Sequence, residues 1–458
     1  DALPISASRM ANAHPRSPAV RDDARMLRIG ATVAALLVPV LAQGKVDYQA
    51  DVKFAIDAIA TQCTTLLASK KIDWKKVTAP LLAESKKTKT PEAHLLLLWR
   101  LLARLQDGHA EVRALEAGKN VRLDVPDRSA APGLFLCRIA GRVHVKNAFG
   151  AAAGAGLAPG MEVVTIEGKP AEAWLQQRAA ELADLISFST PQQAMFFTCH
   201  QGLADVAGTR LELEYRDGAT TRRRTIAFAK GNQTPPGPAF PPEGLQCKQD
   251  VFFGTTATGL GYVHVRRCRD DLPTQIDEAL AALGDVPGLI LDFRGNSGGG
   301  FDHEALFGRF LPTGTSWSGG VKYTSAGPRP YGGPLVVIVD GTVRSAGETA
   351  AGIFGEDGRA YTIGESATAG MSSQKTTIEL PSKLFSLYVA VASNKARFQG
   401  GKGLEGVGYV PMEIVAFDPA DLREQRDTLI RRAEALLQAF PQAKVRYDPK
   451  QHGWSARR

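Results

Sequence analysis

The chain has 458 residues, of which 44% are hydrophobic and 22% are charged, and its formal net charge is +8. This length allows two or three domains with cores of their own, and the composition excludes disordered and fibrous proteins. The basic residues are scattered, and the densest cluster, Arg222 to Arg224, follows YRDGATT in what reads as an exposed hairpin. Without interleaved aromatic residues the cluster indicates a solvated face, so we expect no nucleic-acid partner.

The first 42 residues indicate export. From Met26 the sequence MLRIGATVAALLVPVLAQG has a basic start, an apolar core and small residues after it. That apolar core is too short to span a bilayer and has the build of a secretory signal peptide. We predict an extension at 1–25, a signal peptide at 26–42, and a periplasmic or extracellular protein with no integral membrane segment after cleavage. The alternative is a buried N-terminal helix.

The pattern of apolar residues divides positions 43–257 into a helical region, a β-rich region and a linker. Residues 43–117 read as a helical region, because VKFAIDAIATQCTTLLA and PEAHLLLLWRLLARLQDG repeat apolar residues at i, i+3 and i+4. Residues 118–231 hold short β-like runs around a helical insert near 171–195. The Pro/Gly-rich stretch GNQTPPGPAFPPEG predicts a linker at 232–257 with little regular structure.

From 258 to 445 strands and helices alternate, and a polar tail follows at 446–458. This alternation predicts an α/β core with a mainly parallel sheet. Five cysteines are present, without the C-x-x-C spacing of a zinc site. In an exported chain one or two disulfide bonds are one interpretation, and reduced buried cysteines are an equal one.

Two loops follow strands of this core. LDFRGNSGGG, at 291–300, has glycines that let the backbone approach a ligand, and a plain tight turn is the alternative. We expect Asp292 and Arg294 to fix this loop by hydrogen bonds. VRSAGETAAG places Ser345 at a helix start, where Glu348 completes the spacing of a capping box. A helix start also suits a nucleophile, because its N–H groups can stabilise an oxyanion.

Together with VHVKNAFGAAAGAGLAPGMEVVTIEGKPAEAW, these motifs resemble the tail-specific (C-terminal processing) serine peptidases and their tricorn-core relatives. The motifs fall in the family's order and cover most of residues 95–440. The resemblance implies a PDZ-like domain at 118–231 and a serine peptidase core at 258–445. It makes Ser345 the nucleophile, with an oxyanion hole formed by the N–H of Ala346 and a glycine N–H from Gly298 or Gly299.

The resemblance offers two bases for that serine. The lysine that bacterial tail-specific enzymes carry about 25 residues beyond the serine has no ungapped counterpart here, which leaves Lys375 as a displaced candidate. LLARLQDGHAEV resembles the Asp-Gly-His motif of the tricorn branch and implies His109. Glu405, in GLEGVGYVPMEI, matches that branch's glutamate and is the candidate orienting residue, with Asp107 or Glu111 as alternatives. A histidine base with an unperturbed pKa would lose activity as the pH falls through about 6.5.

The segment GLFL resembles the carboxylate-binding loop of a PDZ domain, which implies that Gly133, Leu134, Phe135 and Leu136 capture the C-terminus of a substrate. A purely structural or lid-like domain is the alternative, in which the helical insert near 171–195 covers the peptide groove.

The combined prediction is an exported serine endopeptidase that acts on peptides or proteins through an acyl-enzyme, with no metal or organic cofactor. A non-catalytic protein that binds peptides or apolar ligands on the same fold is the alternative from another class. An esterase on the same core is a further one.

Overall fold

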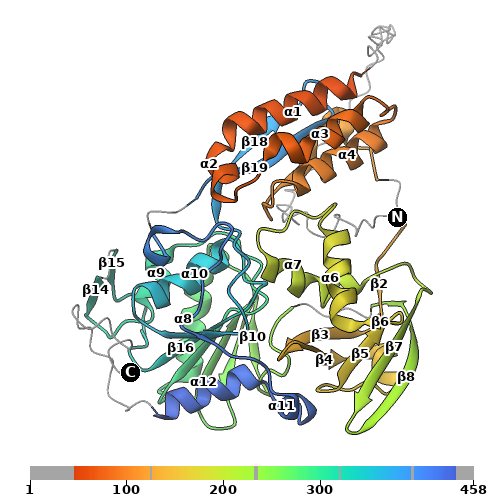
Figure 1. Ribbon diagram of the computed structural model, residues 1–458. Helices are drawn as coiled ribbons and strands as arrows, with labels where there is room; N and C mark the ends of the chain where they lie inside the picture. Colours follow the sequence, from red (N-terminus) through yellow and green to blue (C-terminus); the bar gives the residue numbers. More distant parts are fainter. Residues whose placement is uncertain (1–45, 124–125, 232–235, 319–320, 394–396, 440–458) are drawn as a thin grey trace, which may run out of the picture.

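The computed structural model describes residues 46–123, 126–231, 236–318, 321–393 and 397–439. The predicted extension, signal peptide and polar tail lie outside the described residues. Three units, each with its own core, make up the rest: a helical unit at the top of Figure 1, an α/β unit below it, and a β-rich unit beside the latter. No helix of the described part has the length and apolar character needed to cross a membrane.

The helical unit packs four helices on a three-stranded sheet of order β1-β19-β18. Its elements are α1 (Tyr48–Gln62), α2 (Thr64–Ser69), α3 (Trp74–Ser85), α4 (Pro91–Ala103), β1 (Glu111–Ala114), β18 (Ser373–Glu379) and β19 (Phe385–Ser393). The strands β18 and β19 come from the stretch assigned to the catalytic core, so the predicted boundary is wrong there. The apolar faces of the helices need a partner, and Ile378, Leu387 and Val389 from these strands supply it.

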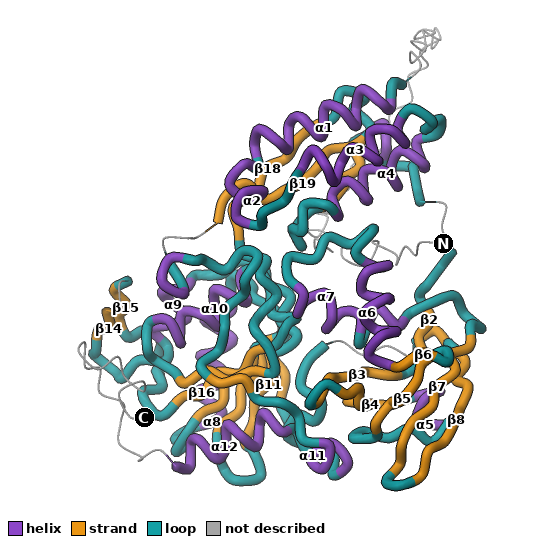
Figure 2. The backbone as a smooth tube through the Cα atoms, viewed as in Figure 1, coloured by secondary structure: helices purple, strands orange, loops and turns teal. Residues whose placement is uncertain are grey.

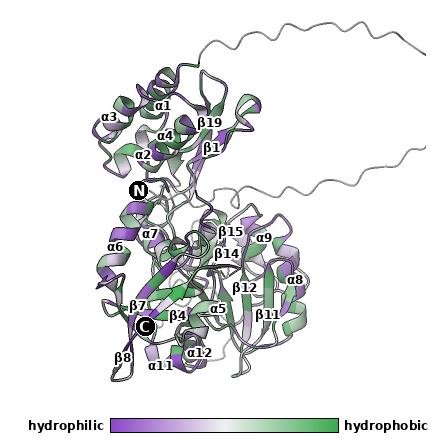
Figure 3. Ribbon diagram, turned by 90° about the vertical axis from the view of Figure 1, so that its right-hand side faces the viewer, coloured by the Kyte–Doolittle hydropathy of each residue, from purple (hydrophilic) through white to green (hydrophobic). Residues whose placement is uncertain are grey.

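The β-rich unit is built on a sheet of order β3-β4-β5-β7-β8, with β6 paired to β5. Its strands are β2 (Ala130–Ala131), β3 (Leu134–Ile139), β4 (Arg142–Ala148), β5 (Glu162–Ile166), β6 (Lys169–Pro170), β7 (Arg210–Asp217), β8 (Thr220–Ala227) and β9 (Ala229–Lys230). Its helices are α5 (Gly150–Gly154), α6 (Ala171–Leu182) and α7 (Pro191–Thr198). The expected hairpin is β7 with β8, and Arg222 to Arg224 are exposed on it, where β8 is hydrophilic (Figure 3).

The α/β unit contains a seven-stranded sheet of order β10-β11-β12-β13-β16-β17-β20. The five strands from β12 to β20 are parallel, which confirms the predicted mainly parallel sheet, and β10 and β11 are antiparallel. The strands are β10 (Gln246–Lys248), β11 (Val251–Thr255), β12 (Gly261–Val265), β13 (Leu289–Asp292), β16 (Leu335–Val339), β17 (Tyr361–Gly364) and β20 (Glu413–Ile414), and a small hairpin pairs β14 (Ser316–Ser318) with β15 (Lys322–Thr324).

The strands β10 and β11 fall in the predicted 232–257 linker, so that prediction is wrong for its second half. Val251 and Phe253 alternate along β11 and are buried in the core, which gives this short segment the pattern of a strand.

Helices cover both faces of this sheet (Figure 2). Residues of α8 (Leu272–Leu283), α9 (His303–Gly308) and α10 (Ala346–Glu356) share one apolar core, and residues of α11 (Pro419–Arg423) and α12 (Thr428–Ala439) share the core on the other face. In the parallel register Asp292 of β13 lies beside Ile338 of β16. The loops that follow these two strands therefore leave the sheet side by side, which brings the two sequence motifs together.

The five cysteines form no disulfide in the structure. Four are buried and Cys247 is exposed, in agreement with the interpretation of reduced, mostly buried thiols.

Candidate active site

A fully buried arginine braces the glycine-rich loop. Nη1 of Arg294 donates to both carboxylate oxygens of Asp427 at 2.9 Å, and Nη2 donates to Asp292 at 2.6 Å. Tyr262 donates its hydroxyl to Asp292 at 2.8 Å. Asp292 and Arg294 thus fix the loop as expected, and Asp427, at the start of α12, is the partner that the sequence did not reveal.

Asn296 holds the next turn of the loop and was also missed. Its amide donates to the Val265 carbonyl at 2.8 Å, its side-chain oxygen accepts the N–H of Gly298 at 2.8 Å, and its own carbonyl accepts the N–H of Arg344 at 3.2 Å. The side chain is fully buried, so these bonds are shielded from water. One residue therefore ties the glycine-rich loop both to β12 and to the segment that carries Ser345.

Ser345 stands directly before α10 in a strained backbone conformation, with φ 56° and ψ −126°. Non-glycine residues adopt such positive φ values rarely, and they cluster at functional sites when they do. The loop closes against this residue: a Cβ on Gly298 would lie 2.8 Å from Cβ of Ser345 and 3.4 Å from the amide nitrogen of Ala346. Only glycine at 298 allows this approach.

Of the three backbone N–H groups predicted as oxyanion donors, two make no hydrogen bond to a described residue and one already donates to a side chain. The N–H of Ala346 begins α10 and makes no hydrogen bond to a described residue, and the same holds for the exposed Gly299. The N–H of Gly298 is already donated to Asn296. The prediction that Gly298 supplies an oxyanion donor is therefore wrong for this structure, since its amide is used to shape the loop; Ala346 and Gly299 are the available pair.

Glu348 does more than cap the helix. Its carboxyl accepts the N–H of Ser345 at 3.3 Å, and it also accepts N–H groups of Gly370 and Met371, each at 2.6 Å, and the hydroxyl of Thr368 at 2.5 Å. Burial raises the pKa of Glu348 to about 8, although these hydrogen bonds act in the opposite direction. This buried carboxyl therefore connects the Ser345 turn with the loop at 368–371.

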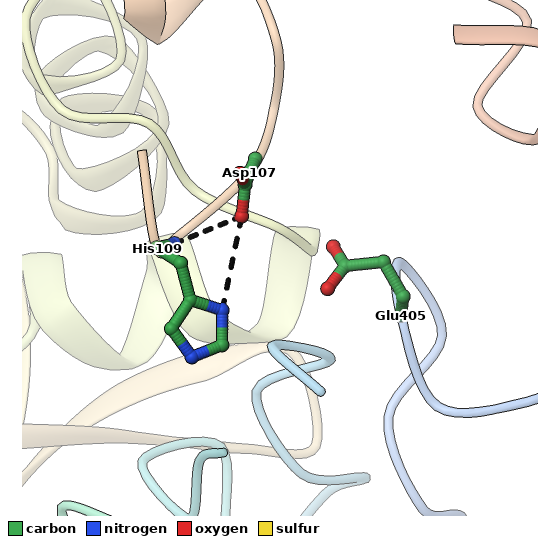
Figure 4. A group of neighbouring side chains, drawn as sticks. All are labelled: Asp107, His109 and Glu405. Carbon is green, nitrogen blue, oxygen red and sulfur yellow. Dashed lines mark hydrogen bonds and ion pairs between the residues drawn. The ribbon is translucent and has the colours of Figure 1, made fainter. Parts of the chain in front are cut away.

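His109 follows α4 in a short turn that Asp107 stabilises (Figure 4). Oδ1 of Asp107 accepts the backbone N–H of His109 at 2.9 Å and lies 3.8 Å from the ring nitrogen Nδ1. Both ring nitrogens are buried and make no hydrogen bond within the described residues. Burial, with the positive charges of Lys375, Arg344 and Lys70, lowers the pKa of His109 to about 3. The ring is therefore neutral at physiological pH, and the acid limb expected near pH 6.5 moves far lower.

Glu405 lies beside this histidine but bonds elsewhere. Its Oε1 accepts from Nζ of Lys70 at 2.7 Å and from the hydroxyl of Ser189 at 3.2 Å, and its Oε2 has no partner among the described residues. Side-chain atoms of Asp107, His109 and Glu405 lie within 4.8 Å of one another, close enough to surround a metal ion. The adjacent positive charge of Lys70 opposes a cation there. The pair of Lys70 and Glu405 joins the end of α2 to the loop that carries Glu405.

Lys375, the alternative base, lies on β18 near the same cluster. Burial lowers its pKa, and the negative charges of Asp107 and Glu405 act against that shift. The register shift in β18 falls between Gln374 and Lys375. Both candidate bases are thus brought into one cluster.

The Ser345 turn and the His109 cluster meet through Met371. The side chain of Met371 packs against Gly108, next to His109: a Cβ on Gly108 would lie 2.6 Å from it. The backbone N–H of Met371 donates to Glu348, which also accepts the backbone N–H of Ser345. The structure therefore brings the predicted nucleophile and base into one region, although no hydrogen bond joins the ring of His109 to Ser345.

The segment Gly133, Leu134, Phe135 and Leu136 is buried. The N–H of Leu136, at the free edge of β3, donates to the carbonyl of Cys199 after α7 at 2.8 Å, and Phe135 packs on Phe196 of α7 and on His200. A peptide strand could pair here only if α7 moved away. The structure thus does not support substrate binding by these four residues.

Comparisons with known proteins agree with this fold. Residues 259–414 match the family model of peptidase family S41. The crystal structure of mature CPAF is similar in fold, with 12% identity, coverage of 86% of this chain and 96% of that chain, and a TM-score of 0.62. Mature CPAF complexed with lactacystin gives 13% identity, coverage of 86% and 97%, and a TM-score of 0.58.

The photosystem II D1 C-terminal processing protease has 22% identity, coverage of 82% and 94%, and a TM-score of 0.40. No curated protein matches the sequence. The match over residues 259–414 to peptidase family S41 agrees with the resemblance to the tail-specific serine peptidases that the motifs carry.

Proposed function

We propose that this serine peptidase cleaves peptide bonds through an acyl-enzyme on Ser345, with His109 as general base. The observation that carries the proposal is the close approach of Gly298 to Ser345 at the start of α10, beside the unpaired amide of Ala346. A serine held in a strained turn between two loops, with free N–H groups next to it, has the arrangement that acyl transfer requires.

In the proposed reaction Oγ of Ser345 attacks the peptide carbonyl carbon while its proton passes to the neutral ring of His109. The N–H groups of Ala346 and Gly299 stabilise the oxyanion, each contributing on the order of 10²–10³ in rate. The C–N bond then breaks, and His109 returns the proton to the leaving amine. Water then attacks the acyl-enzyme while its proton passes to His109. The ester C–O bond breaks, His109 returns this proton to Oγ of Ser345, and the new carboxyl terminus is released. The negative charge of Asp107 stabilises the imidazolium that forms, and Glu405 is the candidate positioning residue.

The experiment measures turnover of a peptide and of a matched ester by the wild type and by Ser345→Ala, His109→Ala and Lys375→Ala. We expect the first two variants to lose activity to a similar extent, about 10³-fold or more, because members of one catalytic unit are not additive. Lys375→Ala should keep most activity, as should Lys383→Ala, an exposed control on the β18–β19 hairpin.

The outcomes separate the alternatives. An inactive Lys375→Ala with an active His109→Ala would assign the base to the lysine. Ester turnover without peptide turnover would indicate an esterase. No turnover of either substrate by the wild type would favour the non-catalytic binding protein.

We also propose export to the periplasm or the extracellular space, on the support of the short apolar run before Ala42. Expression with an exporting bacterial host should give a chain that begins near Gln43. An intact mass that retains residues 26–42 would refute the proposal.

A further inference from the structure

Two guanidinium groups near the nucleophile lack an acidic partner. Arg344 directly precedes Ser345 and is half-buried, and its Nε makes one long hydrogen bond, 3.4 Å, to the carbonyl of Ser297 in the glycine-rich loop. Its two terminal nitrogens donate to no described residue, and neither Arg344 nor the exposed Arg267 forms an ion pair with a described carboxylate. The carbonyl of Arg266 accepts the N–H of Ser297 at 3.0 Å, and the N–H of Cys268 donates to the carbonyl of Gly298 at 3.0 Å. The segment that carries Arg267 therefore lies against the same loop that Arg344 contacts, and the positive charge of Arg267 adds to burial in lowering the pKa of Arg344.

Several other arginines of the same unit have protein partners, although Nη1 of Arg359 has none among the described residues and Arg266 forms no ion pair with a described carboxylate. Arg294 pairs with two carboxylates, Arg309 pairs with Asp277 at 2.7 Å, and the fully buried Arg359 donates to backbone carbonyls. Arg269, two residues beyond Arg267, pairs with Asp250. A partly buried cation without a counter-charge costs free energy, and a ligand can supply the missing charge.

No carboxylate on the adjoining loop fills this role. Oδ1 of Asp270 lies 3.6 Å from the position that a Cβ on Gly300 would occupy, yet Asp270 forms no ion pair with either arginine. Arg344 is next to Ser345 in the chain and its guanidinium reaches Ser297 of the glycine-rich loop, so this positive charge lies close to the Ser345 turn, where the proposed reaction binds its substrate.

We propose that Arg344 and Arg267 form a carboxylate-binding subsite next to the scissile bond. This inference rests on the proposed function and adds a specificity: the preferred peptides carry a negative charge within a few residues of the cleaved bond. The carboxylate is the side chain of Asp or Glu, or the free C-terminus of a peptide cut close to its end. A guanidinium suits either source, because its planar donors match a carboxylate in a two-point contact.

The test compares three peptides of one sequence: an amidated peptide with Asn beside the scissile bond, the same peptide with Asp there, and the Asn peptide with a free C-terminus. For the wild type we expect kcat/KM about tenfold or more higher for at least one of the charged peptides than for the neutral one, the size of one charge-assisted contact. The Asp peptide and the free acid identify the two sources separately. Arg344→Gln and Arg267→Gln should each reduce that ratio, Arg344→Lys should retain part of it, and Arg269→Gln is the matched control that should leave it unchanged.

The same peptides are titrated onto inactive Ser345→Ala by fluorescence anisotropy, so that failure of the proposed chemistry and failure of the subsite are distinguishable. Charge-dependent binding without wild-type turnover would reject the peptidase mechanism and keep the subsite. Equal binding and turnover of all three peptides would overturn the subsite, as would a charge preference that survives both Gln substitutions. Because Arg267 is exposed, its variant keeps the test decisive if Arg344→Gln does not fold.

Discussion

Substituting Gly298 by alanine adds one methyl group where the glycine-rich loop approaches the Ser345 turn. Gly298 has φ 80°, and the new Cβ would lie 2.8 Å from Cβ of Ser345 and 2.9 Å from the carbonyl oxygen of Arg344. A left-handed conformation costs an L-residue roughly 1–2 kcal/mol. The close contacts cannot be relieved by rotating a side chain, because they involve backbone atoms and a Cβ, and so the Ser345 turn must move.

A displacement of about 1 Å at a catalytic group can cost about 100-fold in rate. We therefore expect Gly298→Ala to lower kcat/KM for a peptide about 100-fold or more, with a loss of unfolding free energy of only about 1–3 kcal/mol. Peptide turnover and urea denaturation measure the two quantities on one preparation.

Gly300→Ala is the matched control on the same loop. Its φ lies outside the left-handed region, and the nearest atom, Oδ1 of Asp270, lies at an ordinary contact distance of 3.6 Å from the added Cβ. This variant should keep near wild-type activity. The reasoning is refuted if folded Gly298→Ala retains a third or more of the wild-type activity, or if the two variants lose activity equally.

Three further predictions follow from buried charges. Because burial raises the pKa of Glu348 from 4.5 to about 8, the unfolding free energy should fall as the pH rises between these values. Denaturation curves of Glu348→Gln at several pH values should show a weaker pH dependence, and an unchanged one would contradict the raised pKa of Glu348. Asp427→Asn removes one of the two counter-charges of Arg294 and should cost about 3–5 kcal/mol in urea denaturation, whereas a loss under about 1 kcal/mol would show that the brace is dispensable. Since the pKa of His109 is lowered to about 3, turnover should persist at about pH 5; an activity that instead appears only as the pH rises through the alkaline range would point to Lys375.

The sequence predicted those features of the fold and of the candidate site that depend on residues close together in the chain. The alternation of strands and helices after residue 258 predicted the mainly parallel sheet, and the two loop motifs follow its adjacent strands β13 and β16. The helix start at Ser345 was predicted from its capping spacing.

The remaining features depend on contacts between distant parts of the chain. Lys70 and Glu405 are 335 residues apart, and neither local sequence indicates the ion pair. The strands β18 and β19 were assigned to the wrong unit, because periodicity shows that a segment is a strand and not which helices it will cover. The burial of Phe135 depends on α7, whose position the sequence did not determine.

The most direct test of the account is covalent labelling of Ser345 by a fluorophosphonate, read by intact mass and peptide mapping. The wild type should take up one phosphonyl group on Ser345, at a rate that His109→Ala abolishes and Lys375→Ala leaves largely unchanged, and Ser345→Ala should take up none. A wild-type protein that is folded yet unlabelled, or labelled at another residue, would contradict the assignment of Ser345 as an activated nucleophile.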